Sequence, residues 1–147
     1  PYPMFHGQVI VLLARSGDEC ADELPDGPLI AAVRRGVIIE KRAAQSLGLI
    51  PVDTGSYAQL EMLLDSGRVD LALISEIEGI SPLTRRALRH HQKLCAPAAR
   101  FTLFHYLHRR HAELANTLAE TLEQLEASGE KQRILEQVYK QRLDMLE

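Results

Sequence analysis

The sequence predicts an α/β fold, with a mostly parallel sheet flanked by helices and a C-terminal pair of helices. Between residues 29 and 76, apolar runs of strand length alternate with segments in which apolar residues recur at helical spacing. Residues 69–74 are almost wholly apolar, which is typical of a strand buried on both faces. From residue 112 onward, two amphipathic patterns of helical period follow one another. The length of 147 residues, with 46% apolar and 25% charged residues, fits one globular domain.

The first part of the chain is predicted to contain two strands and one helix. Residues 8–15 are rich in Val, Ile and Leu and predict a strand, whereas residues 16–28 predict a polar loop. Residues 29–33 predict a second strand. A helix is expected over residues 37–47, and the apolar residues at helical spacing that predict it are Ile39, Ala43 and Leu47.

The next helix has the clearest start signal in the sequence. Residues 49–52 predict a third strand, after which Ser56 and Gln59 have the spacing of a capping box. One apolar stripe of this helix consists of Tyr57, Leu60 and Leu64. The apolar run at 69–74 then supplies the next strand, and this alternation favours right-handed βαβ crossovers in a parallel sheet.

The last part of the chain ends in the helical pair. A short helix is expected over residues 82–89, and an extended, apolar-rich segment interrupted at Pro97 is expected over 93–108. The first C-terminal helix places four leucines on one face: Leu114, Leu118, Leu122 and Leu125. After a turn at residues 128–129, the second helix presents Ile134, Leu135, Val138 and Tyr139.

Charge and hydropathy argue against several classes of protein. The formal net charge of -3 is unfavourable for a nucleic-acid-binding protein, which usually has a net basic face. No apolar run approaches the ~20 residues that a membrane-spanning helix needs. The opening residues Pro-Tyr-Pro lack the charged and apolar regions of a signal peptide. Because the sequence opens on Pro rather than Met, we expect a chain that is processed, trimmed or cut from a longer one.

The sequence predicts neither catalysis nor a cofactor or metal. It has no P-loop or Gly-x-Gly-x-x-Gly pattern, and no histidine is expected near its hydroxyl-acid pairs, so we expect no enzyme. His105 and His108 would face opposite sides of a strand and cannot converge on a metal ion. Cys20 and Cys95 form no Cys-x-x-Cys motif. We expect two free, partly buried thiols, with a disulfide as the alternative in an oxidising compartment.

Three segments have a recognisable order and spacing. They are AAVRRG at residues 31–36, LEMLLDSGRVDLA at 60–72, and a closing pattern made of YLHRRHAELA at 106–115 with LEASGE at 125–130. Together they resemble the extracellular, periplasmic solute-binding proteins of family 3, the type that serves ABC importers of polar amino acids. The resemblance covers nearly the whole chain.

This resemblance implies a type II periplasmic-binding-protein-like fold, in which two lobes bury a ligand in an interlobe cleft. Residues 1–147 would form a single solute-binding-like domain, with 8–96 as the core of the second lobe and 97–147 as the return strand and C-terminal helices. The N-terminal part of the first lobe is absent from these residues. The resemblance also implies a periplasmic location and a membrane permease as partner. Because the leucine faces of the C-terminal helices would lack that lobe, we expect self-association through them.

The first group of candidate ligand-binding residues follows the second strand. Gly36 precedes a helix whose first backbone N–H groups, at Val37 and Ile38, can bind a carboxylate with the help of the helix dipole. The proteins that this chain resembles have small hydroxyl residues there, so this chain offers only its backbone donors. Arg34 and Arg35 face opposite sides of a strand, so one of them can reach a ligand, and surface positions for both are the alternative.

Ser75 and Glu76 complete the candidate site at the end of the apolar strand. The resemblance implies an aspartate at position 75 that binds the ammonium group of the ligand, a charge that Ser75 cannot neutralise. Glu76 points elsewhere if the strand continues. An organic anion or a polar neutral solute is therefore expected rather than a standard α-amino acid. The site requires residues 33–36 and 73–76 to end side by side at one edge of the sheet.

The function predicted from the sequence is that of a non-catalytic solute-binding module of an ABC-type import system. Its ligand would be a small polar or anionic, amino-acid-like solute. One alternative is a ligand-sensing or regulatory domain of the same fold, and another is a truncated interaction protein without a ligand.

Overall fold

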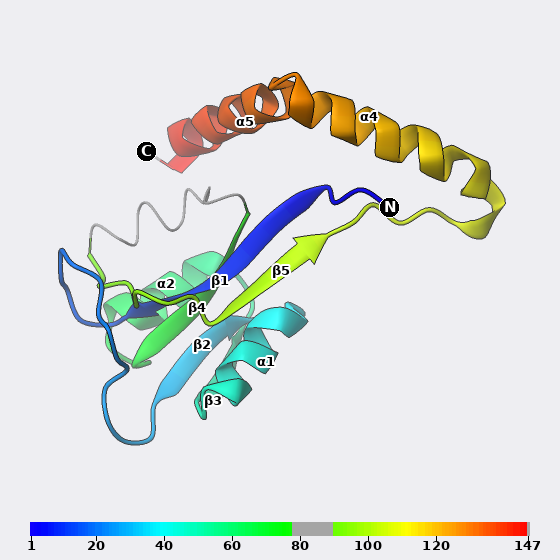
Figure 1. The fold of residues 1–147 in the computed structure, drawn as a ribbon. Coiled ribbons are helices and arrows are strands. Elements are labelled where there is room, and N and C mark those ends of the chain that lie inside the picture. Colours follow the sequence, from blue (N-terminus) through cyan, green and yellow to red (C-terminus); the bar gives the residue numbers. More distant parts are fainter. Residues whose placement is uncertain (78–89, 147) are drawn as a thin grey trace. The chain divides into compact units, whose positions relative to one another are not determined.

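The computed structural model describes residues 1–77 and 90–146, and the helix expected over 82–89 lies outside the described residues (Figure 1). The chain divides into two compact units. The larger unit is Gln8–Arg100, and the smaller unit combines Pro1–Gly7 with Phe101–Glu147. We describe the two units one after the other.

The five described strands form one sheet with the order β3-β2-β4-β1-β5. The strands are β1 (Phe5–Leu13), β2 (Ile30–Arg34), β3 (Ile50–Thr54), β4 (Leu71–Ile77) and β5 (Ala99–Leu103). Strand β2 pairs in parallel with both β3 and β4. Helices α1 (Ile38–Ser46) and α2 (Tyr57–Asp65) connect these three strands. The predicted βαβ crossovers are therefore confirmed.

The remaining strands make the sheet mixed rather than fully parallel. At one end of β1, Ala14 N donates to Asp70 O over 2.9 Å, and at the other end the Gln8 side chain donates to Glu76. The residue numbers of β1 therefore decrease along the pair as those of β4 increase, so the two strands are antiparallel. No helical crossover joins β1 to the parallel strands, and the chain reaches β2 through the polar loop predicted at 16–28.

The two helices of the larger unit cover opposite faces of its sheet. Leu60 and Leu64 of α2 pack in one buried cluster with residues of three strands, among them Ile74. The next residue along β4, Ser75, instead hydrogen-bonds Glu40 of α1. Since successive side chains of a strand point to opposite faces, α1 and α2 lie on different sides of the sheet.

The buried face of α1 differs from the predicted one. The stripe expected at residues 39, 43 and 47 is wrong in part, because Leu47 is 38% exposed. The buried residues of α1 are Glu40, Ala43 and Ala44. The helix is thus rotated so that a carboxylate, rather than an isoleucine, faces the sheet.

The predicted capping box at the start of α2 is confirmed. The Ser56 hydroxyl accepts a hydrogen bond from Gln59 N over 3.1 Å. The Gln59 side chain in turn accepts from Gly55 N over 2.7 Å, one residue before the N-cap. This pair of bonds fixes where α2 begins.

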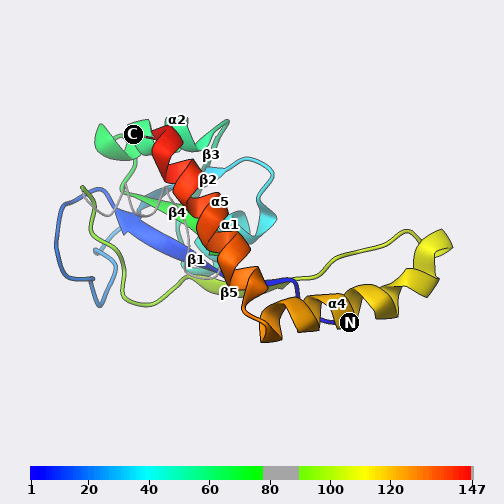
Figure 2. The same ribbon diagram turned by 90° about the horizontal axis from the view of Figure 1, so that it is seen from above.

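The smaller unit contains the predicted helical pair. After a 3₁₀ helix, η1 (Arg109–Leu114), the chain forms α4 (Ala115–Ala127) and α5 (Glu130–Leu146), with the turn at Ser128 and Gly129. Figure 2 shows the chain changing direction at this turn. No residue of α4 is buried. Among the described residues, we find no helix whose length and apolar character would let it cross a membrane.

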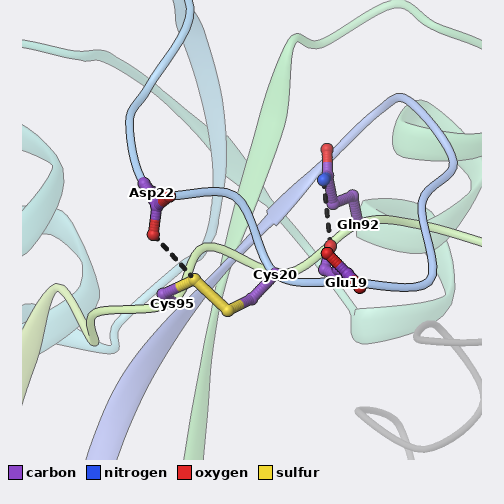
Figure 3. Close-up of a disulfide and its surroundings, with 5 residues drawn as sticks. All are labelled: Glu19, Cys20, Asp22, Gln92 and Cys95. Atoms are coloured by element: carbon purple, nitrogen blue, oxygen red, sulfur yellow. Dashed lines mark hydrogen bonds between the residues drawn. A yellow bond between two sulfur atoms is a disulfide. The ribbon is translucent and has the colours of Figure 1, made fainter.

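The expectation of two free thiols is wrong, because Cys20 and Cys95 form a disulfide with a Cα–Cα distance of 4.9 Å (Figure 3). Residue Ala21 pairs with the segment around Leu94 in an isolated parallel bridge, and Cys95 N donates to Ala21 O over 2.8 Å. This local pairing aligns two cysteines that are 75 residues apart. The carboxylate of Asp22 lies beside the bridge, 3.6 Å from Cys95 Sγ.

Candidate functional site

The ends of β2 and β4 lie side by side, as the candidate site requires. Ala31 is opposite Leu71, and Ala32 is opposite Ala72, in a parallel register. Continuing that register places residues 33–36 and 73–76 at the same edge of the sheet. The prediction that these two segments share an edge is confirmed. Helices α1 and α2 both begin near it, because each follows the end of a parallel strand.

A buried carboxylate that we did not predict, Glu40, connects the elements at this edge. Glu40 is 0% exposed and lies in the first turn of α1. Its Oε2 accepts a hydrogen bond from Arg34 N at the end of β2, over 2.8 Å. Its Oε1 accepts from Ser75 N over 3.1 Å and from Ser75 Oγ over 3.0 Å. The Tyr57 hydroxyl at the start of α2 is a longer contact, at 3.4 Å.

These donors determine the electrostatics of Glu40. Burial raises the pKa of Glu40 above its ordinary value, because the charged form loses its hydration. Hydrogen bonds from Arg34 N, from Ser75 and from Tyr57 act in the opposite direction on this pKa. Each carboxylate oxygen receives one backbone N–H, which favours the ionised form and orients the group.

Tyr57 is held as a neutral phenol beside this carboxylate. Burial, together with the charge and the hydrogen bond of Glu40, raises the pKa of Tyr57 to about 12. The Arg34 guanidinium, 5.7 Å from the centroid of the Tyr57 ring, opposes this shift. The phenol therefore stays protonated, and its hydroxyl donates a hydrogen bond to Glu40.

We expect Tyr57 to ionise later than an ordinary tyrosine. The native chain and the Tyr57→Phe variant can each be titrated while the absorbance of phenolate is recorded. Subtracting the two titration curves should leave the ionisation of Tyr57 alone, with its midpoint near the pKa of about 12. Because the folded-state pKa lies above the unfolded value of roughly 10, its contribution to stability is present below pH ~10 and is lost as the pH rises toward 12. A difference spectrum with a midpoint near pH 10 would contradict this environment of Tyr57.

The two arginines of the candidate site have different roles. The Arg34 side chain is directed toward the start of α2, where Nη1 donates to Gly55 O and the guanidinium lies over Tyr57. Arg35 is exposed, and its backbone N donates to Thr54 O over 2.9 Å. Within the described part of the chain, its guanidinium has no hydrogen bond or ion pair. Of the two arginines, Arg34 is therefore the one whose guanidinium is already engaged by neighbouring groups of the described chain.

The start of α1 offers backbone donors, but the predicted pair is wrong in part, because Val37 N already donates to Arg34 O over 3.1 Å. Gly36 has a φ of +85°, which lets the chain turn from β2 into the helix. Val37 is the N-cap and makes no side-chain capping bond. The N–H groups of Ile38 and Ile39 have no acceptor among residues 1–77 and 90–146. These two groups point along the helix axis toward the edge of the sheet.

Ser75 and Glu76 are on opposite faces of β4. Ser75 is partly buried and donates its hydroxyl proton to Glu40. Glu76 is 5% exposed, and its carboxylate accepts from the Gln8 side chain of β1. The structure thus brings Ser75 to the first turn of α1, and it separates Glu76 from both.

The described residues also form a cavity away from this edge. It has a volume of ≈ 650 Å³ and lies within the smaller unit. Leu118 and Leu122 of α4 line it together with Ala112 of η1 and the segment 104–109, which includes Tyr106, a residue that is 86% exposed. None of the predicted ligand-binding residues contributes to this cavity. Among the described residues, no three metal-ligating side chains converge.

Sequence comparison identifies no relative of this chain, because no protein-family model and no curated protein matches it. Structure comparison gives strong matches. The amino acid ABC transporter substrate-binding protein AbpA from Streptococcus pneumoniae, bound to L-arginine, matches with a TM-score of 0.70 and 16% identity over 94% of this chain. The GluR0 ligand-binding core from Nostoc punctiforme, in complex with L-glutamate, matches with a TM-score of 0.68 and 12% identity over 89% of this chain.

A third match is the ancestral amino acid-binding protein AncCDT-1, described as a precursor of cyclohexadienyl dehydratase, with a TM-score of 0.64 and 16% identity over 93% of this chain. This chain spans only about three-fifths of each of these proteins: 59% of AbpA, 60% of the GluR0 core and 59% of AncCDT-1. At such identities the matches establish the fold. The chain therefore has the type II periplasmic-binding-protein-like α/β fold that amino-acid-binding proteins of ABC transporters share.

Proposed function

We propose that this chain is a non-catalytic solute-binding module of an ABC-type import system. Its ligand would be a small polar or anionic, amino-acid-like solute, bound at the edge formed by the ends of β2 and β4. The likeness to amino-acid-binding proteins of ABC transporters supports this role. A membrane permease as partner, a periplasmic location and self-association through α4 and α5 belong to the same proposal.

The observation that carries the proposal is the set of donors at this edge. The N–H groups of Ile38 and Ile39 and the exposed guanidinium of Arg35 all lie after the end of β2. Donors at the start of a helix suit a carboxylate, because the helix dipole adds a favourable field. The nearby negative charge of Glu40 is buried and already has its own donors, so it does not occupy these groups.

The alternative is a ligand-sensing or regulatory domain of the same fold, and the match to the GluR0 ligand-binding core favours it. Both functions use the same solute-binding step. They differ in the partner to which the chain passes the signal or the solute.

Binding can be tested by thermal shift and calorimetry with L-glutamate, L-arginine and glutarate. We expect at least one of the two dicarboxylates to raise the Tm at millimolar concentration, since a ligand stabilises a protein by RT ln(1 + [L]/Kd). Arg35→Ala should weaken that binding by about tenfold, as expected for the loss of a charge-assisted hydrogen bond. Arg42→Ala is the matched control, because it removes the same charge from an exposed position further along α1. No shift with any probe at about 10 mM would refute the proposed function.

A further inference from the structure

We propose that the groove between α4 and residues 104–109 is the interface of a homodimer, in which α4 of a second copy packs antiparallel to α4 about a two-fold axis. This inference rests on the self-association that belongs to the proposed function, and it names the surface, the partner and the orientation. None of the candidate solute-binding residues lines the groove. Dimerisation and solute binding can therefore be tested separately.

The groove is the cavity of ≈ 650 Å³ in the smaller unit, and its surface is mostly apolar. Leu118 and Leu122 of α4 line it, and so does Tyr106, which is 86% exposed. Leu114, directly before α4, is 46% exposed, and no residue of α4 is buried. An apolar surface of this kind marks an interaction site, and tyrosine is a frequent anchor residue in such sites.

The apolar stripe next to this groove fits a second copy of itself. Its members are four, four and three residues apart: Leu114, Leu118, Leu122 and Leu125. Counted from either end, these spacings keep the side chains on one face of a helix. In a two-fold dimer each contact occurs twice, so Leu118 of either copy would face Leu122 of the other. Two antiparallel α4 helices can therefore pack leucine against leucine.

The distribution of charge selects the antiparallel orientation. Residues 105–111 contain two arginines, three histidines and no acidic residue, whereas residues 120–126 contain three glutamates and no basic residue. Helix α4 has no acidic residue in its first turn and no basic residue in its last turn, so these charges do not complement its dipole. A parallel partner would place like charges together. An antiparallel partner places the basic segment of each copy beside the acidic segment of the other.

The size of this surface predicts a weak dimer. Helix α4 has 13 residues. Such a helix is about 20 Å long. A contact made by one helix and one adjoining segment lies at the lower end of the sizes found for specific interfaces. We therefore expect a dissociation constant of roughly 10–100 µM.

Sedimentation equilibrium over about 5–500 µM tests dimerisation directly, because this range brackets the expected dissociation constant. The native chain should change from monomer to dimer across the range. Tyr106→Ala should raise the dissociation constant by about tenfold, as expected for the loss of an aromatic anchor. Because Tyr106 is 86% exposed, this variant should fold like the native chain. Met62→Ala is the matched control, since it truncates a 57% exposed side chain of the larger unit and should leave the dissociation constant unchanged.

Charge reversal tests the orientation. The double variants R109E/R110E and E120K/E123K should each be mainly monomeric at a concentration at which the native chain is dimeric, because like charges then meet across the interface. An equimolar mixture of the two variants should form dimers again. These four side chains are exposed, so neither variant should disturb the fold. The control R42E/R68E reverses two exposed charges of the larger unit and should dimerise like the native chain.

The outcomes distinguish this inference from the proposed function. A native chain that is monomeric at about 500 µM refutes the dimer and shows that the groove has another occupant, whereas solute binding is unaffected by that result. A dimer that withstands Tyr106→Ala and both charge reversals refutes this interface, and a mixture that stays monomeric refutes the antiparallel pairing. Dimers of the native chain without binding of any solute probe would support this inference and refute solute binding. Should a charge variant not fold, the native dimer can be measured in about 0.05 M and 0.5 M NaCl, and a dissociation constant that does not rise with salt refutes the charge pairing.

Discussion

Replacing both cysteines by serine, C20S/C95S, should lower the free energy of unfolding by about 2–4 kcal/mol. The disulfide joins residues that are 75 positions apart, and a cross-link that closes so long a loop restricts the unfolded chain strongly. Both cysteines are exposed, so dithiothreitol should produce the same loss in the native chain. Urea denaturation followed by far-UV circular dichroism, with and without the reductant, measures the effect.

Asp22→Ala provides the matched control for this experiment. It removes the carboxylate that lies 3.6 Å from Cys95 Sγ and leaves the bridge intact. Its unfolding transition should stay within about 0.5 kcal/mol of the native one and should keep its sensitivity to the reductant. Coincident transitions of the oxidised and reduced chains would show that the bridge does not stabilise the fold.

Leu60→Ala should destabilise the chain by about 2–5 kcal/mol. Leu60 is 1% exposed and belongs to the cluster that anchors α2 on the sheet, together with Leu64 and Ile74. Truncating it removes buried apolar contacts and leaves a cavity that the surrounding strands cannot fill. The same urea experiment measures the loss.

Met62→Ala is the control on the same helix, because Met62 is 57% exposed. It should change the free energy of unfolding by no more than about 0.5 kcal/mol. Because α2 also positions Tyr57, the pKa of Tyr57 can be measured in Leu60→Ala as well. A pKa that stays raised would show that Tyr57 still contacts Glu40 in this variant. Equal effects of the two substitutions would contradict the assignment of the buried face of α2.

The sequence predicts the larger unit well wherever local signals are strong. The start of α2 follows from Ser56 and Gln59, because a capping box is a property of four consecutive residues. The shared edge of β2 and β4 follows from the alternation of strands and helices, because right-handed crossovers leave few topologies. The antiparallel placement of β1 does not follow, since it depends on contacts such as that between Ala14 and Asp70.

Glu40 was missed because an acidic residue in the first turn of a helix is ordinarily a solvated partner of the helix dipole. A signal for its burial was nevertheless present. Glu40, Ala43 and Ala44 have the spacing of one helix face, and two small apolar residues on that face indicate close packing against the sheet. The predicted stripe was based on the larger apolar side chains of Ile39 and Leu47, and it therefore identified the wrong face of α1 as the buried one.

The disulfide could not be predicted from the positions of the cysteines. Cys20 lies in the polar loop after β1, and Cys95 lies in the segment before β5. They meet because the short bridge between Ala21 and Leu94 aligns these two segments, and the sequence around Ala21 predicts only a polar loop. Pairing across 75 residues is a property of the tertiary structure.

The contact between Glu40 and Ser75 places a constraint on any redesign of this chain for new ligands. An acidic substitution at position 75 would put a second carboxylate about where the serine oxygen now lies, 3.0 Å from Glu40, and two carboxylates so close cannot both ionise. Engineering an acidic residue at position 75 therefore requires a simultaneous neutral replacement at position 40. The two positions, 35 residues apart, must be varied as a pair in any mutant library.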